Sequence, residues 1–502
     1  MAERKVEERK HLFGTTERSD FILNMTPQGT HKFCGMYSII AIVVLLIVNI
    51  PYTFAKHTFE YTEDEVRHYG DDMFADYIGI LVIGVGLIGM WFFLVGRMKK
   101  EVNLKDNRLL LLPAAIIAVS AWSMFASGAI STAFLGYLDR NEGMLTILAY
   151  WGFFAGGMAV TNDGWRKKFT DLVIAVGLLN AVIGILQAIP AMYDIMPNKF
   201  KDLFVRFGAT AAEGEIVTNE GIFEKAYTAT GLLITPYALA AVMTIVFGLA
   251  AAGFAFEKSA KKKVFYGVSA AAATAAAVLT KTIVGIIGIS GAAVALLVIS
   301  AVKAGAKKQK APFIIALCTT IVLSAGVAGI VVSGAVESKD EQIIYTDTFY
   351  RMSMGLPREN KDMWIYPYLW NDGGYVLEQN ILTGAGPDNW GEMYSEGCTT
   401  DRCYNEYLDV GMQRGIICMI LYIGFLLVTL VKLVKALKLH FKDDKETSWV
   451  AVGLFSAVIG YLVQAFFNSG SNYSSPYFWL VMGICWSYFA VKKVKSKTTE
   501  EQ

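Results

Sequence analysis

Arginine and tryptophan side chains are concentrated in one long polar segment, residues 337–414, between two apolar runs. Arg351, Arg358 and Arg402 carry guanidinium groups, which bind phosphate through a planar fork of donors. Trp364 and Trp370 carry flat aromatic faces that can stack on a sugar ring. The alternative for each of these residues is a belt of aromatic rings and anchoring charges at a membrane surface. The segment therefore has the residue types needed to bind a phosphorylated sugar.

The end of this segment adds residues that could move a proton or form a disulfide. Cys398 and Cys403 lie together in the polar loop, where oxidising surroundings would favour a disulfide and reducing ones would leave two thiols. Tyr404 and Glu406 follow them. A tyrosine hydroxyl, with a reference pKa near 10, is a poor base at neutral pH, so Tyr404 could orient or bind a ligand. Glu406 is the better candidate for a base if its side chain faces the same site.

The composition places these residues in a membrane protein. Apolar residues make up 54% of the chain and charged residues 18%, and the mean hydropathy is +0.43, which is too apolar for a soluble protein of this length. Twelve windows of about twenty apolar residues are each long enough to span a bilayer. They are residues 36–55, 77–96, 110–132, 144–162, 170–190, 230–256, 264–280, 282–302, 312–335, 415–434, 449–467 and 474–491. We expect an all-α polytopic membrane protein of about 12 transmembrane helices.

The charges of the connecting segments predict the topology. Lys and Arg gather in the connections near residues 97–108, 166–168, 258–263, 303–310 and 432–445, and in the tail near 492–497. The connections between them are acidic, neutral or very short. Because cytoplasmic loops carry an excess of Lys and Arg, both termini are expected in the cytoplasm. We expect cytoplasmic tails over 1–35 and 492–502, helices 1–9 over 36–335 with an external loop at 191–229, a lid-like extracytoplasmic loop over 336–414, and helices 10–12 over 415–491.

A series of motifs between about residues 170 and 430 resembles the O-antigen ligase and O-antigen polymerase superfamily. Trp370 precedes a glycine turn at residues 380–386, and residues 404–408 (YNEYL) open the next apolar run, with Gly415 eleven residues after Tyr404. Gln187 and residues 221–223 fit the same series. The chain departs from the family pattern where Tyr404 replaces a histidine and where residues 280–283 (TKTI) replace Thr-x-Ser-Arg. It therefore resembles a divergent member of this superfamily.

The resemblance implies a multi-pass glycosyltransferase of the bacterial plasma membrane that acts in polysaccharide biosynthesis of the cell envelope. The donor would be a glycan linked to a polyprenyl diphosphate such as undecaprenyl diphosphate, and the acceptor a hydroxyl of a glycan, lipid or protein. No cofactor, metal or nucleic acid is expected. Catalysis would need cations for the departing diphosphate and a base for the hydroxyl. The resemblance gives catalytic roles to Tyr404, Glu406 and Arg351, and substrate-binding roles to Arg206, Lys281, Arg358, Arg402, Arg414, Trp364, Trp370 and Asn405.

Two other functions fit the same composition. Twelve helices with both ends inside are also a common plan of transporters, such as a flippase for a glycolipid or a carrier of a small solute. Transporters tend to place ionisable residues in the middle of the membrane and to have two related halves. In the predicted spans, Asn180 and Gln187 are the notable polar groups. A catalytically inactive glycan-binding scaffold would fit the replacement of the family histidine by Tyr404.

Overall fold

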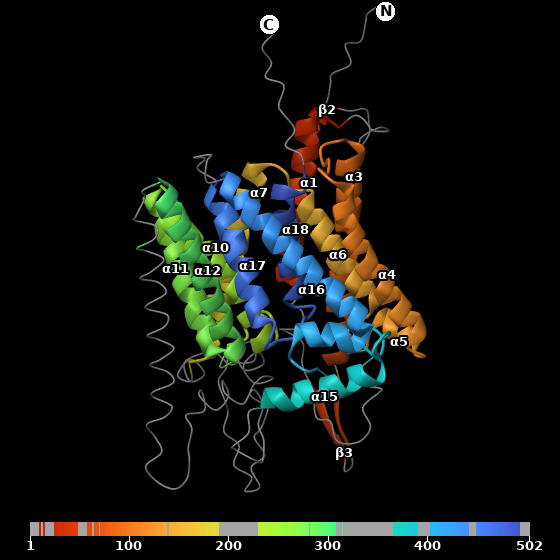
Figure 1. Cartoon of the computed structure of the whole chain (residues 1–502). Helices are drawn as coiled ribbons and strands as arrows, with labels where there is room; N and C mark the ends of the chain where they lie inside the picture. Colours follow the sequence, from red (N-terminus) through yellow and green to blue (C-terminus); the bar gives the residue numbers. More distant parts are fainter. Residues whose placement is uncertain are drawn as a thin grey trace, which may run out of the picture.

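The computed structural model describes residues 10–11, 14–15, 25–48, 58–62, 65–69, 71–137, 140–189, 229–280, 282–307, 314, 365–389, 402–440 and 448–491. These residues form a helical bundle and two short antiparallel hairpins (Figure 1). The helices are α1 (Pro27–Val48), α3 (Asp71–Met98), η1 (Asn107–Leu110), α4 (Leu111–Ala126), α5 (Ile130–Leu135), α6 (Met144–Met158), α7 (Asp163–Gln187), α10 (Pro236–Phe256), α11 (Ala260–Leu279), α12 (Ile283–Lys307), α15 (Ile365–Gln379), α16 (Glu406–His440), α17 (Ser448–Gln464) and α18 (Ser475–Phe489). The hairpins pair β1 (Lys10–His11) with β2 (Gly14–Thr15), and β3 (Thr58–Thr62) with β4 (Glu65–Tyr69).

The described helices confirm the predicted class of a largely helical, multi-pass membrane protein. Seven of them are long and apolar enough to cross a membrane, by length and composition. Helices overlap eleven of the twelve predicted windows, and the ninth window, 312–335, falls outside the described residues except at Ile314. The seventh and eighth windows correspond to two separate helices, because α11 ends at Leu279 and α12 begins at Ile283.

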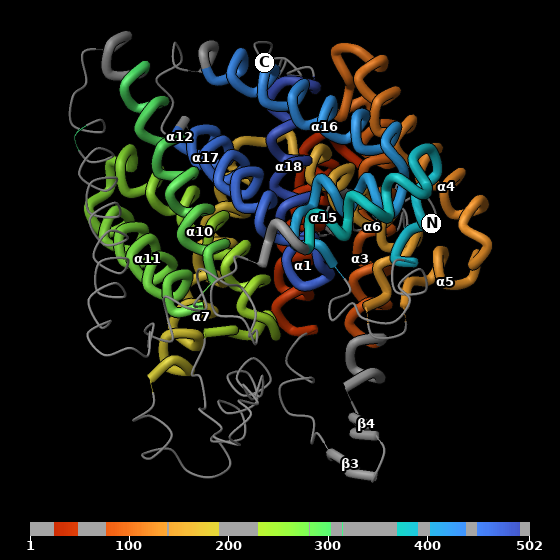
Figure 2. Tube along the Cα trace, turned by 60° about the horizontal axis from the view of Figure 1, so that its bottom comes forward, coloured from red at the N-terminus to blue at the C-terminus, as the bar shows by residue number. Residues whose placement is uncertain are grey.

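Two helices form the centre of the bundle. Every residue of α18 is buried, and so are most residues of α10, as expected for helices that are hydrophobic on all sides. Figure 2 shows α18 between the α10–α12 side of the bundle and the α3–α6 side. Where α6 crosses α18, a Cβ atom at Gly157 would collide with the Leu480 carbonyl, and one at Gly483 with the Phe154 carbonyl. Small residues therefore allow the backbones of these two helices to touch.

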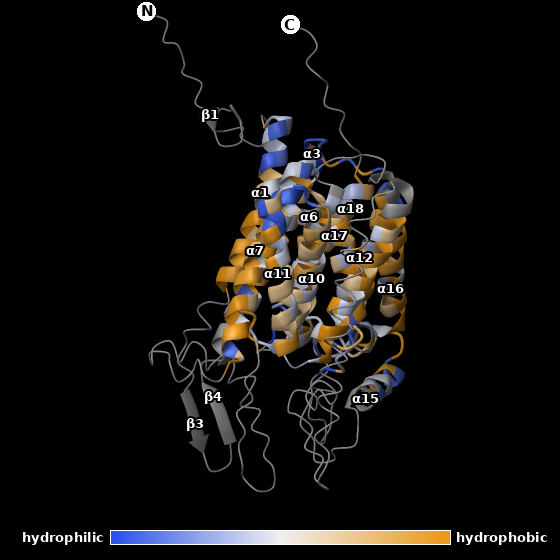
Figure 3. Ribbon diagram, turned by 90° about the vertical axis from the view of Figure 1, so that its left-hand side faces the viewer, coloured by the Kyte–Doolittle hydropathy of each residue, from blue (hydrophilic) through white to orange (hydrophobic). Residues whose placement is uncertain are grey.

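One end of the bundle collects basic residues, and we call it the basic end. It comprises residues 97–108, 163–168 and 257–263 with the last turn of α18. These segments are joined by contacts: the Lys105 amide donates to the Ala490 carbonyl at 2.7 Å, Arg166 binds Ser487, and Lys167 lies 3.6 Å from the Glu257 carboxylate. Figure 3 shows hydrophobic residues along the middle of the helices and hydrophilic residues toward their ends.

The opposite end of the bundle contains a broken helix, and we call it the broken-helix end. It comprises residues 137–143, 385–389, 402–415 and 465–475, with α15 lying across it (Figures 1 and 2). α16 is interrupted at Gly415, whose φ of 80° and ψ of 164° are not helical. A Cβ atom there would also collide with the Leu382 carbonyl, so the position requires glycine.

The glycine turn predicted at residues 380–386 holds this break in place. The amides of Ala385 and Gly386 donate to the carbonyls of Met412 and Gln413, at 2.8 and 2.9 Å, and the Ile416 amide donates to the Ile381 carbonyl at 2.8 Å. These bonds satisfy two carbonyl groups before the break and one amide after it, which the interrupted helix leaves without intrahelical partners. The turn thereby fixes the last residues of the short first part of α16, which includes Arg414.

Candidate active site

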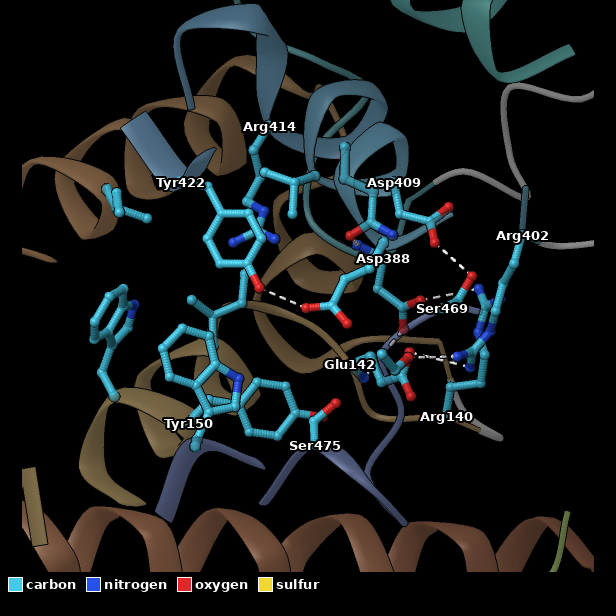
Figure 4. Close-up of a pocket in the computed structure, with 18 residues that line it drawn as sticks. Arg140, Glu142, Tyr150, Asp388, Arg402, Asp409, Arg414, Tyr422, Ser469 and Ser475 are labelled. Carbon is cyan, nitrogen blue, oxygen red and sulfur yellow. Dashed lines mark hydrogen bonds and ion pairs between the residues drawn. The ribbon is translucent and has the colours of Figure 1, made fainter. Parts of the chain in front are cut away.

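A cavity of about 790 Å³, a volume that includes its opening to solvent, lies at the broken-helix end. Its wall comes from α4, the α5–α6 connection, α6, the glycine turn, α16, the α17–α18 connection and α18. The polar and charged residues on the wall are Arg140, Glu142, Tyr150, Asp388, Arg402, Glu406, Asp409, Gln413, Arg414, Tyr422, Ser469 and Ser475. Figure 4 shows most of these side chains around the cavity.

Two arginines on the wall are held by carboxylates. The Arg140 guanidinium lies 3.0 Å from Asp388 Oδ1, and the Arg402 guanidinium lies 3.0 Å from Glu142 Oε2. Arg402 also donates to the Gly470 carbonyl at 2.7 Å. These pairs join the α5–α6 connection to Asp388, just after the glycine turn, and to Arg402, just before α16. Arg140 and Arg402 therefore supply positive charge that the protein has already partly neutralised.

Asp388 binds the backbone of the α5–α6 connection. Its Oδ2 accepts hydrogen bonds from the backbone amides of Tyr137 at 2.7 Å and Glu142 at 3.2 Å. Burial raises the pKa of Asp388 above its ordinary value, whereas the Arg140 guanidinium and the two amides oppose that rise. Asp388 has a φ of 55°, a left-handed conformation that aspartate tolerates better than most residues.

Two carboxylates of α16 face the cavity from the short first part of the helix. Glu406 accepts hydrogen bonds from Tyr422 at 2.5 Å and from Tyr461 at 3.2 Å. Asp409 accepts one from the Ser469 hydroxyl at 2.5 Å and one from the Cys403 thiol at 3.0 Å. Residues 406 and 409 are three apart, so they lie on the same face of the helix.

Arg414 differs from the other two arginines on the wall. Among the described residues it forms no ion pair with a carboxylate, and its buried Nε has no hydrogen-bond partner. It is the last residue before the break at Gly415. A buried guanidinium nitrogen without a partner is costly, and a bound anion would remove that cost. Arg414 is therefore the described cation best placed to receive a phosphate group.

The structure brings together three of the predicted site residues, Arg402, Glu406 and Arg414, on this one cavity. Tyr404 lies just before α16 with a φ of 50°, and its ring packs on Tyr237 with centroids 4.9 Å apart, away from the cavity wall. Glu406, two residues later, is on the wall. The candidate base is thus the carboxylate and not the phenol.

Two further predicted residues have structural contacts. The Asn405 side chain accepts from the Leu408 amide at 3.1 Å and so caps the start of α16. Trp370 packs on Phe467, with ring centroids 5.7 Å apart, in a small apolar cluster beneath α15. Neither residue is on the cavity wall. Their predicted roles in substrate binding remain predictions.

The remaining predicted residues cannot be placed. Arg206, Lys281, Arg351, Arg358, Trp364 and Cys398 lie outside the described residues. Cys403 is a buried thiol, and burial together with the Asp409 carboxylate raises its pKa well above the ordinary value. The disulfide between Cys398 and Cys403 remains a prediction.

Several wall residues were not expected from the sequence. Arg140 and Glu142 belong to the connection 133–143, which we interpreted only as a topological marker, and Asp388, Asp409 and Ser469 were not singled out. A signal was present at residues 139–142 (DRNE), where charges of both signs lie close together in a short connection between two apolar windows. The serine- and asparagine-rich residues 468–475 gave a second signal. Among the described residues, no group of three or more His, Cys, Asp and Glu side chains could hold a metal ion.

Comparison of the chain with protein-family models and with curated proteins gave no match. The resemblance to the O-antigen ligase and polymerase superfamily therefore remains a prediction from the motifs quoted above.

Proposed function

We propose that the chain is a membrane glycan polymerase or ligase. It transfers or polymerises an oligosaccharide linked to a polyprenyl diphosphate onto an acceptor hydroxyl at the outer face of the bacterial cytoplasmic membrane. One observation carries the proposal: Arg402, Glu406 and Arg414, predicted from the segment that leads into α16, line one cavity together with Arg140, which comes from a connection more than 250 residues earlier. A transfer from a diphosphate needs this combination of cations and a base.

The proposed orientation follows from the two ends of the bundle. Twelve spans with both termini in the cytoplasm would place the basic end inside and the broken-helix end outside. The described parts of the basic connections, at residues 97–108, 163–168 and 257–263, support this orientation because they meet at the end opposite the cavity. The cavity would then open toward the predicted external loop 336–414, which would act as its lid.

The proposed reaction is a single displacement or its dissociative equivalent. The acceptor oxygen forms a bond to the anomeric carbon, and the bond from that carbon to the diphosphate oxygen breaks. The electron pair leaves with the diphosphate, where Arg414 stabilises the negative charge. The proton of the acceptor hydroxyl passes to the Glu406 carboxylate. Arg140 and Arg402 add positive potential to the cavity while their carboxylate partners keep them in place.

A second candidate function is a transporter or flippase for a glycolipid. The break in α16 at Gly415 favours it, because transporter binding sites are often formed by discontinuous helices. A third candidate, a glycan-binding scaffold, is favoured by the commitment of Arg140 and Arg402 to internal ion pairs.

The test uses purified full-length protein in liposomes with a polyprenyl-diphosphate-linked oligosaccharide and a soluble acceptor glycan. We expect a new glycosidic bond with the wild type and losses of roughly 10²- to 10³-fold for Arg414→Ala, the size typical of removing one charge-stabilising donor. Arg402→Ala and Glu406→Ala should also be slow. Lys432→Ala is the control, since Lys432 is an exposed residue on the same helix.

The outcomes separate the candidates. Transfer at the wild-type rate by all three site variants would contradict the assignment of the site. Movement of the donor across the bilayer without a new bond would favour the transporter, and binding without turnover would favour the scaffold.

A further inference from the structure

The Glu406 carboxylate is held by two phenols that come from different parts of the bundle. Tyr422 donates to Oε1 at 2.5 Å and Tyr461 donates to Oε2 at 3.2 Å. Both tyrosines are buried, at 3% and 1% exposure, so water does not replace these donors. The Glu406 amide also donates to the Ala465 carbonyl at 2.9 Å, which fixes the backbone at the same point. We call Glu406, Tyr422 and Tyr461 the carboxylate clamp.

The clamp bridges the break in α16. Glu406 lies in the short part of the helix before Gly415, whereas Tyr422 lies in the long part after it, and Tyr461 lies in α17. Figure 4 shows Tyr422 directing its hydroxyl into the cavity, where a dashed line marks its hydrogen bond. The clamp therefore fixes the position of the carboxylate relative to two helices, the long part of α16 and α17. Without these two bonds the Glu406 side chain would be free to rotate.

The chemistry of the clamp favours a carboxylate over a carboxylic acid. Each carboxylate oxygen has two acceptor sites, so one phenol on each oxygen leaves acceptor sites unused. Hydrogen bonds to an ionised acceptor are about twice as strong as neutral ones. If Glu406 were protonated, the charge that strengthens both phenol bonds would be lost. The two phenols thus support the charged, proton-accepting form.

We propose that Tyr422 and Tyr461 are positioning residues that orient the Glu406 carboxylate toward the cavity and favour its ionised form, which can receive the proton of the acceptor hydroxyl. This inference rests on the proposed transfer function. The phenols keep their own protons throughout, and only the bond between the acceptor oxygen and its hydrogen breaks in the proton-transfer step.

A nearby tyrosine provides a matched contrast. Tyr407 is next to Glu406 in the chain, but its hydroxyl donates to the Leu462 backbone carbonyl at 2.6 Å. Its removal costs one buried phenol hydrogen bond, as in the clamp, without changing the donors on Glu406. The other titratable or charged groups that act on Glu406 are Tyr407, Asp409, Arg414 and Tyr150, with Glu142 and Arg402 on the same cavity wall. Of these groups only Tyr407 is altered in the variants below, as the control.

The first test measures transfer against pH for Tyr422→Phe, Tyr461→Phe and Tyr407→Phe in liposomes, with the polyprenyl-diphosphate-linked oligosaccharide as donor. A phenol that donates to Glu406 stabilises the ionised form more than the protonated form, so the acid limb of the kcat profile should move up by roughly one to two pH units in each clamp variant. KM for the donor should stay the same. Tyr407→Phe should keep the wild-type profile, and profiles of both clamp variants that overlay the wild type would overturn the proposal.

The second test does not depend on transfer. Infrared titration of the carboxyl stretch, with Glu406→Gln used to identify the Glu406 band, follows the protonation of this side chain directly. We expect protonation of Glu406 at higher pH in Tyr422→Phe and Tyr461→Phe than in Tyr407→Phe. Equal titration in all three would overturn the clamp even if the wild type transfers glycan. If the wild type transfers no glycan but Glu406 still becomes protonated at higher pH in the clamp variants, the proposed function is overturned and the clamp is supported.

Discussion

The two ends of the bundle use arginine in different ways. At the basic end, Arg166 donates to the Val160 carbonyl and the Ser487 hydroxyl at 3.0 Å, pairs with Asp163 at 2.7 Å, and lies 4.0 Å over the Tyr488 ring. At the broken-helix end, Arg414 has a buried Nε without a partner among the described residues and lines the cavity.

The difference shows how a structural charge can be told from a candidate site charge. Arg166 and Arg414 are the same residue type, and each lies near a helix end. What separates them is whether the protein itself uses the donors of the guanidinium group. Buried donors that the protein satisfies stabilise the fold, whereas donors left over in a cavity are available to a ligand.

The largest expected effect compares one carboxylate from each end. Glu406→Gln removes the proposed base and should slow transfer by roughly 10²- to 10⁴-fold, the usual contribution of general base catalysis. Glu257→Gln changes a buried carboxylate at the basic end that pairs with Lys167, and transfer per folded molecule should not change. Initial rates with purified protein, normalised to folded protein, measure both. Equal losses in the two variants would erase the distinction between the ends.

The next effect concerns stability at the basic end. Arg166→Ala leaves Asp163, the Val160 carbonyl and Ser487 without their donor, and breaking a buried charged network of this kind costs about 3–5 kcal/mol. Lys168→Ala, two residues away on the same helix, removes an exposed lysine over the Trp165 ring and should cost at most about 1 kcal/mol. Thermal unfolding in detergent measures the difference. A Lys168 variant as unstable as the Arg166 variant would contradict the structural role of Arg166.

The smallest effect tests the break in α16. Gly415→Ala forces a left-handed conformation on alanine, which costs about 1–2 kcal/mol before the collision with the Leu382 carbonyl is added. Transfer should also fall, because Arg414 would move. Gly424→Ala is the control, since a Cβ atom there meets nothing within 4 Å and alanine favours the helix. A Gly415 variant that matched the Gly424 variant in thermal stability and transfer would show that the break is not required.

The sequence predicted most of the helices because a helix that crosses a membrane needs about twenty consecutive apolar residues, and such windows are visible in the sequence. It did not predict α15, whose apolar face is short and interrupted by Asn371, Asp372 and two glycines. The motif series placed residues 404–408 at the opening of the next run and the apolar window started at residue 415, but neither predicted that α16 is broken at Gly415. A break held by hydrogen bonds from a distant turn has no signature in local hydropathy.

The site was predicted in part for a similar reason. Glu406 and Arg414 lie on the helix that the motif series marked, and Arg402 directly precedes it, so these residues could be identified. Arg140 comes from a connection more than 250 residues earlier and meets Asp388 only through the packing of the bundle. The sequence favoured Glu406 over Tyr404 as a base on pKa, but it did not show the left-handed backbone at Tyr404 or that Glu406 faces the cavity while Tyr404 does not.

The most direct test of the comparison between the two ends is photolabelling of the purified protein. The probe is a polyprenyl-diphosphate-linked disaccharide with a photoreactive group on the sugar next to the diphosphate, and the labelled peptides are mapped by mass spectrometry. We expect label on peptides that contain residues 140–151, 402–422 and 469–479, and much less of it in Arg414→Ala. Label confined to residues 97–108 and 163–168 of the basic end would contradict the account.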